Sequence, residues 1–291
     1  MNRIDFKKYN RILGISTGIL SFVVFALTVE PTASYWDCAE YISTSAKLQI
    51  GHPPGAPLFQ MLGAIFSIFA LELNQIAYAV NMMSVLSSAL TIVFLFWSIS
   101  LIGKEILGLT NSLKKDQAIK VFGSSFLGSI SFTFTDSFWF NAVEAEVYAM
   151  ATLILAILFW LGLKWVDDFE NQRADKWLIL ISFVVGLSFG VHFMGLLAIP
   201  SIGLLYYFKK YKKFNIKSFL IANIISVSIL LFIFKLLLPS TLSMFGNLEV
   251  FFVNDLGLPF NSGTIFTAFI LVGIIYYALN YSYKKKLYLM N

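Results

Sequence analysis

The chain has 291 residues, of which 58% are hydrophobic, and its mean hydropathy is +0.78. This composition excludes an ordinary soluble domain and is typical of a protein that crosses a membrane several times. The formal net charge of +5 does not indicate nucleic-acid binding, because the basic residues occur in short clusters between apolar runs. The single cysteine, Cys38, excludes an intrachain disulfide and a cysteine-based zinc site.

Apolar stretches long enough to span a bilayer recur along the chain, since a transmembrane helix needs about 20 apolar residues. The short apolar segment 56–72 is expected to form an interfacial or re-entrant helix. The segment 177–208 is too long for one span, and we expect a tight hairpin of two short helices that turns near Gly190-Val191-His192. Spanning helices are expected over 12–29, 76–102, 119–135, 147–165, 217–238 and 263–283.

The basic residues support this arrangement of about eight crossings plus one interfacial helix. With a cytoplasmic N-terminus, all but two of the 21 Lys and Arg residues fall in cytoplasmic segments, the exceptions being Lys47 and Lys235. Lys235 lies in the expected span 217–238, three residues from its outer end, and is expected to reach the interface. Counting 56–72 as a crossing, or 177–208 as one span, would move clusters of lysines to the outer side.

The sequence therefore predicts an all-α polytopic membrane protein with one transmembrane domain over residues 1–291. Its first outer loop, residues 30–75, and the other outer segments are rich in carboxylates. We expect a multi-pass protein of a bacterial inner membrane, with this outer side facing the periplasm. The residues from Lys284 onward indicate the N-terminal part of a longer protein.

The first outer loop holds the polar residues that are candidates for chemistry. Ser34 precedes Asp37 by three residues, which predicts a capped helix that starts near Tyr35 and stops at Gly51. Asp37, Glu40 and Tyr41 would then share one face of this helix.

The segment His52-Pro53-Pro54-Gly55 follows and predicts an extended turn, because the residue before a proline is driven out of helix. Asp37 could act as a general base on an acceptor hydroxyl, while Lys47 and His52 could meet an anionic leaving group such as phosphate. The alternative is that Asp37 only caps a helix and His52 only anchors a turn. Their position beside a bilayer favours the functional interpretation.

These residues resemble the first external loop of GT-C membrane glycosyltransferases, and of the protein O-mannosyltransferases in particular. That likeness rests on the pair Trp36-Asp37 and on the turn His52-Pro53-Pro54. A closer likeness is to the family that groups large Bacteroidetes membrane proteins with the vertebrate transmembrane O-mannosyltransferase of plexin-type receptors. There the pattern continues through Gly55, Pro57, Leu58 and Phe59, and the stretch 138–148 resembles the second external loop.

The resemblance implies a GT-C-like helical bundle that moves a sugar, with mannose as one candidate, from a polyprenyl-phosphate donor to a hydroxyl of an extracytoplasmic protein. Asp37 would be the general base of an inverting transfer, assisted by Glu40. Residues expected to support the site are Trp36, Tyr41, Pro53, Pro54, Gly55 and Glu146.

Two further sites add candidates. Of Glu144 and Glu146, we expect only one to point at Asp37, because alternate residues of a helix do not share a face, and Glu146 is preferred. His192, at the tip of the hairpin, is either a structural hydrogen-bonding group or a contact for the donor phosphate. No metal is required by the sequence, although a divalent cation between Asp37, Glu40 and Glu146 is an alternative.

Two other functions fit a polytopic chain. A transporter or lipid-carrier flippase is disfavoured by the gathering of carboxylates at one face and by the lack of an internal repeat. A membrane scaffold of an envelope complex would suit a chain with several long polar outer loops better. The expected partners are thus the bilayer, a lipid-linked sugar and a protein acceptor, with no nucleic acid.

Overall fold

The computed structural model describes residues 3–171, 173–211 and 213–284. These residues form two compact units, which are described separately below. The first unit comprises residues 3–171 and 176–198, and the second comprises 173–175 and 199–284. The expected all-α polytopic membrane fold is confirmed, whereas the single domain over 1–291 remains a prediction.

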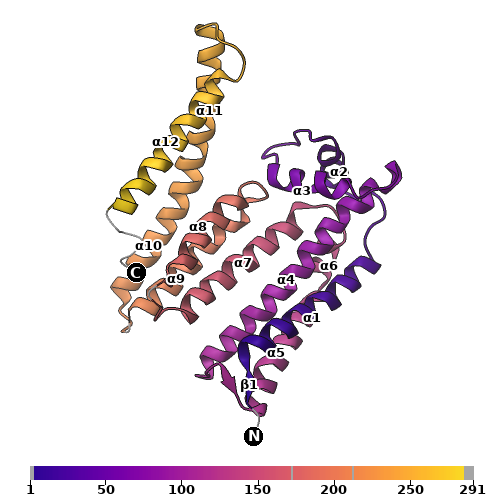
Figure 1. Cartoon of the computed structure of the whole chain (residues 1–291), viewed down its shortest axis with the longest axis vertical. Helices are drawn as coiled ribbons and strands as arrows, with labels where there is room; N and C mark the ends of the chain where they lie inside the picture. Colours follow the sequence, from indigo (N-terminus) through magenta and orange to yellow (C-terminus); the bar gives the residue numbers. More distant parts are fainter. Residues whose placement is uncertain (1–2, 172, 212, 285–291) are drawn as a thin grey trace. The chain divides into compact units, whose positions relative to one another are not determined.

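The first unit is built around one long helix, α4 (Ile76–Ile106), which contacts most of the other helices of the unit. Short elements lie at both of its ends (Figure 1). The long neighbours are α1 (Phe6–Leu27), α5 (Lys115–Thr133), α7 (Val147–Asp167) and, against α7, α8 (Lys176–Ser188). The short elements beside the N-terminal end of α4 are α2 (Cys38–Lys47), α3 (Pro57–Ser67), η1 (Leu73–Gln75) and α6 (Asp136–Ala142).

Glycines allow α1 to approach α4 closely. A Cβ atom at Gly18 would come within 2.2 Å of Val93 Cγ2, and one at Gly14 within 2.3 Å of Trp97 Nε1. Small residues at such contacts are the usual means by which helices pack in a membrane, where lipid supplies no hydrophobic driving force. At the opposite end from α2 and α3, two short strands that the sequence did not predict, β1 (Ile4–Asp5) and β2 (Ser112–Leu113), form an antiparallel pair.

The second unit consists of α9 (Ala198–Lys210, from Ile199 onward), one long apolar helix over 216–255, and α12 (Ser262–Lys284). The long helix comprises α10 (Ile216–Phe232), η3 (Ile233–Leu237), α11 (Leu238–Val250) and η4 (Phe251–Asp255). The helix thus continues beyond 238, where the expected span ends, and Lys235 lies in the interior of the helix. The π-helical turn η3 ends two residues before Pro239, which has no N–H to donate and crowds the preceding turn.

Five helices are long and apolar enough to cross a membrane within the described residues: Phe6–Leu27, Leu73–Ile106, Val147–Asp167, Ile216–Asp255 and Ser262–Lys284. Each overlaps an expected span. The helix expected at 56–72 is α3, which has only 11 residues, and the segment 177–208 breaks at residues 189–192 as predicted. Crossings by α5, α8 and α9 remain predictions, because α5 carries charged residues in its first two turns and α8 and α9 have 13 residues each.

Asn81, a fully buried residue of α4, holds together the outer segments that carry the candidate site. Its Nδ2 donates to the carbonyl oxygens of Glu30 (2.7 Å) and Thr32 (2.9 Å), in the segment that follows α1. Its Oδ1 accepts from the backbone N–H of Ala145 (2.8 Å), just before α7, and from Cys38 Sγ (3.8 Å) at the start of α2. One side chain of α4 therefore joins two segments that are far apart in the sequence, residues 30–38 and the stretch just before α7.

Replacing Asn81 with alanine is expected to destabilise the protein by roughly 2–4 kcal/mol, because it leaves two part-buried carbonyls and one buried N–H without partners. Thermal unfolding in detergent measures this loss. Asn223→Ala is the matched control, since Asn223 Nδ2 donates only to the carbonyl of Phe219, four residues back in its own helix. Equal unfolding temperatures for the two variants would contradict the role assigned to Asn81.

Candidate active site

Asp37 lies at the start of α2, and its carboxylate forms no hydrogen bond with the backbone N–H groups of the helix. The helix begins at Cys38 and not near Tyr35, because Trp36 has a φ of 63° and Ser34 Oγ donates to Glu144 instead of capping α2. Asp37 is the N-cap residue, yet its side chain makes no capping hydrogen bond, and 54% of the side chain is exposed. The interpretation of Asp37 as a mere helix cap is therefore wrong.

His52 bridges the two carboxylates of α2. Its Nδ1 lies 3.0 Å from Glu40 Oε2, and its Nε2 lies 3.6 Å from Asp37 Oδ2. Its backbone N–H also donates to Glu40 Oε1 at 2.6 Å. The hydrogen bond with Glu40, followed by the charges of Glu40 and Asp37, raises the pKa of His52, and the backbone N–H of His52 lowers the pKa of Glu40. Because both oxygens of Glu40 face His52, Glu40 positions the imidazole and leaves Asp37 as the carboxylate open to a substrate.

The turn 52–55 holds His52 in this position. The Pro53–Pro54 peptide bond is cis, and the N–H of Gly55 donates to the carbonyl of His52 at 2.8 Å. Gly55 has a φ of 88°, a conformation that glycine adopts without strain. Pro57 then occupies the first turn of α3, where a missing N–H costs no hydrogen bond.

Glu144 and Glu146 lie together with Asp37 around one cavity of about 320 Å³. Both precede α7 in non-helical backbone, so the helix-face argument does not apply to them. The charge of Asp37 acts on the pKa of Glu146, the preferred residue, whereas Glu144 accepts a hydrogen bond from Ser34. The cavity is lined by Trp36, Asp37, Phe140, Asn141, Glu144, Glu146 and Tyr148. Of these, Phe140, Asn141 and Tyr148 were not expected as site residues, although all three fall in the stretch 138–148 that carries the family resemblance.

Glu146 is the most perturbed acid of this cavity. Its side chain is 5% exposed, and its Oε1 has no hydrogen-bond partner among the described residues. Burial, followed by the charges of Asp37 and Glu144, raises the pKa of Glu146 to about 7. At neutral pH this carboxyl is therefore poised to hold or release a proton beside Asp37.

Tyr41 packs beneath the carboxylates. Its ring centroid lies 5.1 Å from that of Phe59 and 5.9 Å from that of His52. Burial and the nearby charges of Glu146, Asp37 and Glu40 raise the pKa of Tyr41 to about 12. The phenol consequently keeps its proton and can act only as a hydrogen-bond donor or neutral acceptor near these acids.

Lys47 and His192, the two other candidates for contact with a phosphate, lie in different environments. Lys47 is exposed in the last turn of α2, ten residues after Asp37, and does not line the cavity. His192 belongs to the turn 189–192, which docks on α3 through hydrogen bonds from the N–H groups of Leu58 (2.7 Å) and Phe59 (3.2 Å) to the carbonyl of Gly190.

His192 is held beside the cavity as a neutral side chain. Its ring lies 5.5 Å from that of Tyr148, a cavity residue, and its Nδ1 accepts from the N–H of Met194 at 3.2 Å. Burial lowers the pKa of His192. A contact of this residue with a donor phosphate would therefore be a neutral hydrogen bond rather than an ion pair.

A divalent cation would find its ligands in a different set from the one expected. The ligand atoms of Asp37, Glu40 and His52 lie within 4.8 Å of one another, whereas the sequence suggested Asp37, Glu40 and Glu146. Two carboxylates and an imidazole suit several divalent metals. His52 can act as a ligand only when it is unprotonated, and its hydrogen bond with Glu40 favours the protonated form.

Comparison with known proteins places the chain in a family. A family model described as "Protein O-mannosyl-transferase TMEM260 N-terminal domain" matches residues 37–215, which include Asp37, His52, Glu146 and His192. A "Protein O-mannosyl-transferase tmem260" of Dictyostelium discoideum is 27% identical over 191 residues, which cover 61% of this chain and 21% of the relative. The "Protein O-mannosyl-transferase TMEM260" of Mus musculus is 25% identical over 165 residues, which cover 57% of this chain and 21% of the relative. The chain thus spans about a fifth of the length of these relatives. No solved structure matches it.

The raised pKa of Glu146 predicts a pH-dependent loss of stability. The folded protein binds this proton more tightly than the unfolded chain, so the stabilisation is complete below the ordinary pKa of 4.5 and is lost as the pH rises through about 7. Between pH 5 and pH 8, the unfolding temperature of the wild type should fall relative to that of Glu146→Gln, by an amount equivalent to about 1–3 kcal/mol. Glu72→Gln, at an exposed carboxylate outside the cavity, is the control. Parallel pH profiles for wild type and Glu146→Gln would contradict this prediction.

Proposed function

Because the chain belongs to the protein O-mannosyl-transferase TMEM260 N-terminal domain family, we propose that it carries the catalytic site of a membrane glycosyltransferase that acts on protein hydroxyls. The observation that carries the proposal is the carboxylate of Asp37, which is exposed and does not cap α2. This carboxylate lines a cavity of about 320 Å³. This carboxylate lies at the end of the first unit opposite to the N-terminus of α1. With the expected topology, the cavity faces the extracytoplasmic side.

In the proposed reaction, Asp37 removes the proton of a serine or threonine hydroxyl as the hydroxyl oxygen attacks the anomeric carbon of the donor sugar. The bond between that carbon and the phosphate oxygen breaks, and the phosphate leaves with its electron pair on the lipid carrier. Attack opposite the leaving group inverts the configuration. A polyprenyl-phosphate sugar, with mannose as the first candidate, suits this geometry because its lipid tail can stay in the bilayer beside the cavity.

His52 supplies positive charge next to the base. Within the part of the chain that the structure describes, it is the basic group paired with Asp37, cationic when protonated, and Glu40 binds both its ring Nδ1 and its backbone N–H. This charge offsets the mutual repulsion of three nearby carboxylates and orients Asp37. It also makes His52 the first candidate to meet the departing phosphate, with His192 as a neutral partner.

We expect Asp37→Asn to reduce sugar transfer by about 100-fold or more, since a positioned general base contributes roughly 10²–10⁴ in rate. Purified protein would be incubated with labelled polyprenyl-phosphate mannose and protein acceptors, and label on protein would be counted. Asp136→Asn is the control, because Asp136 is an exposed carboxylate in the first turn of α6 that does not line the cavity.

Comparable unfolding temperatures for the wild type and the two variants would show that each one is folded. Transfer by Asp37→Asn at the wild-type rate would refute the role of Asp37 as base. Flux of substrate across vesicles without any covalent product would favour the transporter or flippase, and stoichiometric partners without any sugar product would favour the scaffold.

Chelation should leave the transfer rate unchanged. Both oxygens of Glu40 already bond to His52, and the hydrogen bond with Glu40 raises the pKa of His52, which disfavours the unprotonated ring that a metal would need. The rate measured after treatment with EDTA and desalting would be compared with that of an untreated sample. A rate that falls with EDTA and returns with Mn²⁺ or Mg²⁺ would instead show that Asp37, Glu40 and His52 hold a metal.

A further inference from the structure

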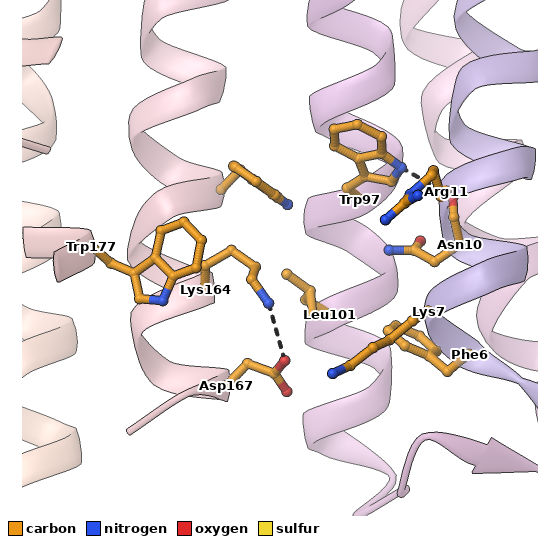
Figure 2. A pocket seen from close by; sticks show the side chains of 10 residues that line it. Phe6, Lys7, Asn10, Arg11, Trp97, Leu101, Lys164, Asp167 and Trp177 are labelled. Atoms are coloured by element: carbon orange, nitrogen blue, oxygen red, sulfur yellow. Dashed lines mark hydrogen bonds and ion pairs between the residues drawn. The ribbon is translucent and has the colours of Figure 1, made fainter. Parts of the chain in front are cut away.

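A second cavity lies at the other end of the first unit, and the proposed reaction does not use it. Its volume is about 440 Å³, within the range of small-molecule sites. Figure 2 shows side chains from α1, α4, α7 and α8 around it. Along α4, Asn81 beside the candidate active site and Trp97 beside this cavity are 16 residues apart, which corresponds to roughly 24 Å.

The cavity has an excess of positive charge. Lys7, Arg11 and Lys164 line it, whereas Asp167 is the one carboxylate among its lining residues. Asp167 is already neutralised, because its oxygens lie 2.6 Å from Lys104 Nζ and 3.4 Å from Lys164 Nζ. Within the described residues, Lys7 and Arg11 have no carboxylate partner. An anion in the cavity would therefore meet two unpaired cations on α1.

The walls of the cavity are built from tryptophans. The ring of Trp160 lies 5.6 Å from that of Trp97 and 6.2 Å from that of Trp177. Trp97 is held in place by a hydrogen bond of 3.0 Å from its Nε1 to the carbonyl of Asn10. Asn10 Oδ1 accepts from Ser100 Oγ at 2.6 Å, which leaves the side-chain amide of Asn10 free to donate. Tryptophan is characteristic of the level at which lipid headgroups lie.

The face of α1 that carries Arg11 becomes apolar toward the middle of the helix. Ile15 and Ile19 follow Arg11 at intervals of four residues and therefore share its face of the helix. Both are exposed, by 43% and 59%, on a helix that is long and apolar enough to cross a membrane. A molecule with a phosphate in the cavity could thus extend its acyl chains along α1 into the bilayer.

We propose that this cavity binds the phosphate headgroup of an anionic phospholipid from the leaflet that surrounds the N-terminal end of α1. Arginine and lysine are the residues that bind phosphate oxygens, and the tryptophans and Asn10 complete a polar and aromatic pocket at headgroup depth. The distribution of charge predicts that this leaflet is the cytoplasmic one, which carries the anionic lipids. The proposal does not depend on the reaction proposed for Asp37.

Native mass spectrometry of the purified protein in neutral detergent tests the proposal, with phosphatidylglycerol, phosphatidylcholine and inorganic phosphate as separate probes. Lys7→Gln/Arg11→Gln should weaken binding of phosphatidylglycerol about 30-fold, because each of these two basic groups in contact with the headgroup would contribute roughly fivefold in affinity. Arg3→Gln/Lys8→Gln removes the same charges from the same end of the chain but outside the cavity, and should bind as the wild type does.

Three results would overturn the proposal: equal binding of phosphatidylcholine and phosphatidylglycerol by the wild type, equal losses in the two double variants, or displacement of the lipid by millimolar inorganic phosphate. The first and third use only the wild-type protein, so they decide the matter even if the cavity variant does not fold. Lys7→Arg/Arg11→Lys, which keeps both charges, should retain binding, and its loss would also count against the proposal.

Discussion

The candidate site depends on the four hydrogen bonds of Asn81. Glu30 and Asp37 lie on one segment and Glu146 on a distant one, and residues of both segments form hydrogen bonds with Asn81. A fully buried amide in the middle of them offers two donors and one acceptor oxygen, and the structure uses all of these groups. Because the helix that bears Asn81 is also the central helix of the first unit, the geometry of the outer segments is tied directly to the packing of the bundle.

Electrostatics divides the first unit into two ends. Around Asp37, carboxylates predominate, and the structure accommodates them by bridging two of them with His52 and by raising the pKa of buried Glu146 to about 7. At the N-terminal end of α1, cations predominate, and the one carboxylate of the cavity there is neutralised by lysines on both sides. An acidic end suits proton removal, and a basic aromatic end suits contact with an anionic lipid surface.

Local patterns allowed much of the fold and part of the site to be predicted. The five long apolar helices follow from length and composition, because an apolar stretch of about 20 residues satisfies its own backbone in lipid. The break near Gly190-Val191-His192 was also predicted, as was the short helix after Pro57. Asp37, Glu40 and His52 meet because they lie within 16 residues of one another, joined by one helix and one proline turn.

Other features depend on contacts that no local pattern encodes. The start of α2 shifted because Ser34 bonds to Glu144, 110 residues away, and the continuation of the helix beyond 238 depends on a π-helical turn that accommodates Pro239. Asn81 lies within an apolar span, where no local pattern indicates its role. The cavity lined by Lys7 and Trp177 is formed by residues of four helices. The sequence by itself determined which helices are long and apolar enough to cross a membrane and which short motif forms the candidate site, because hydrophobic length and proline geometry act locally. Only the tertiary structure decided how Glu146 is buried beside Asp37 and which cations remain unpaired, because burial and charge pairing are set by residues far apart in the chain.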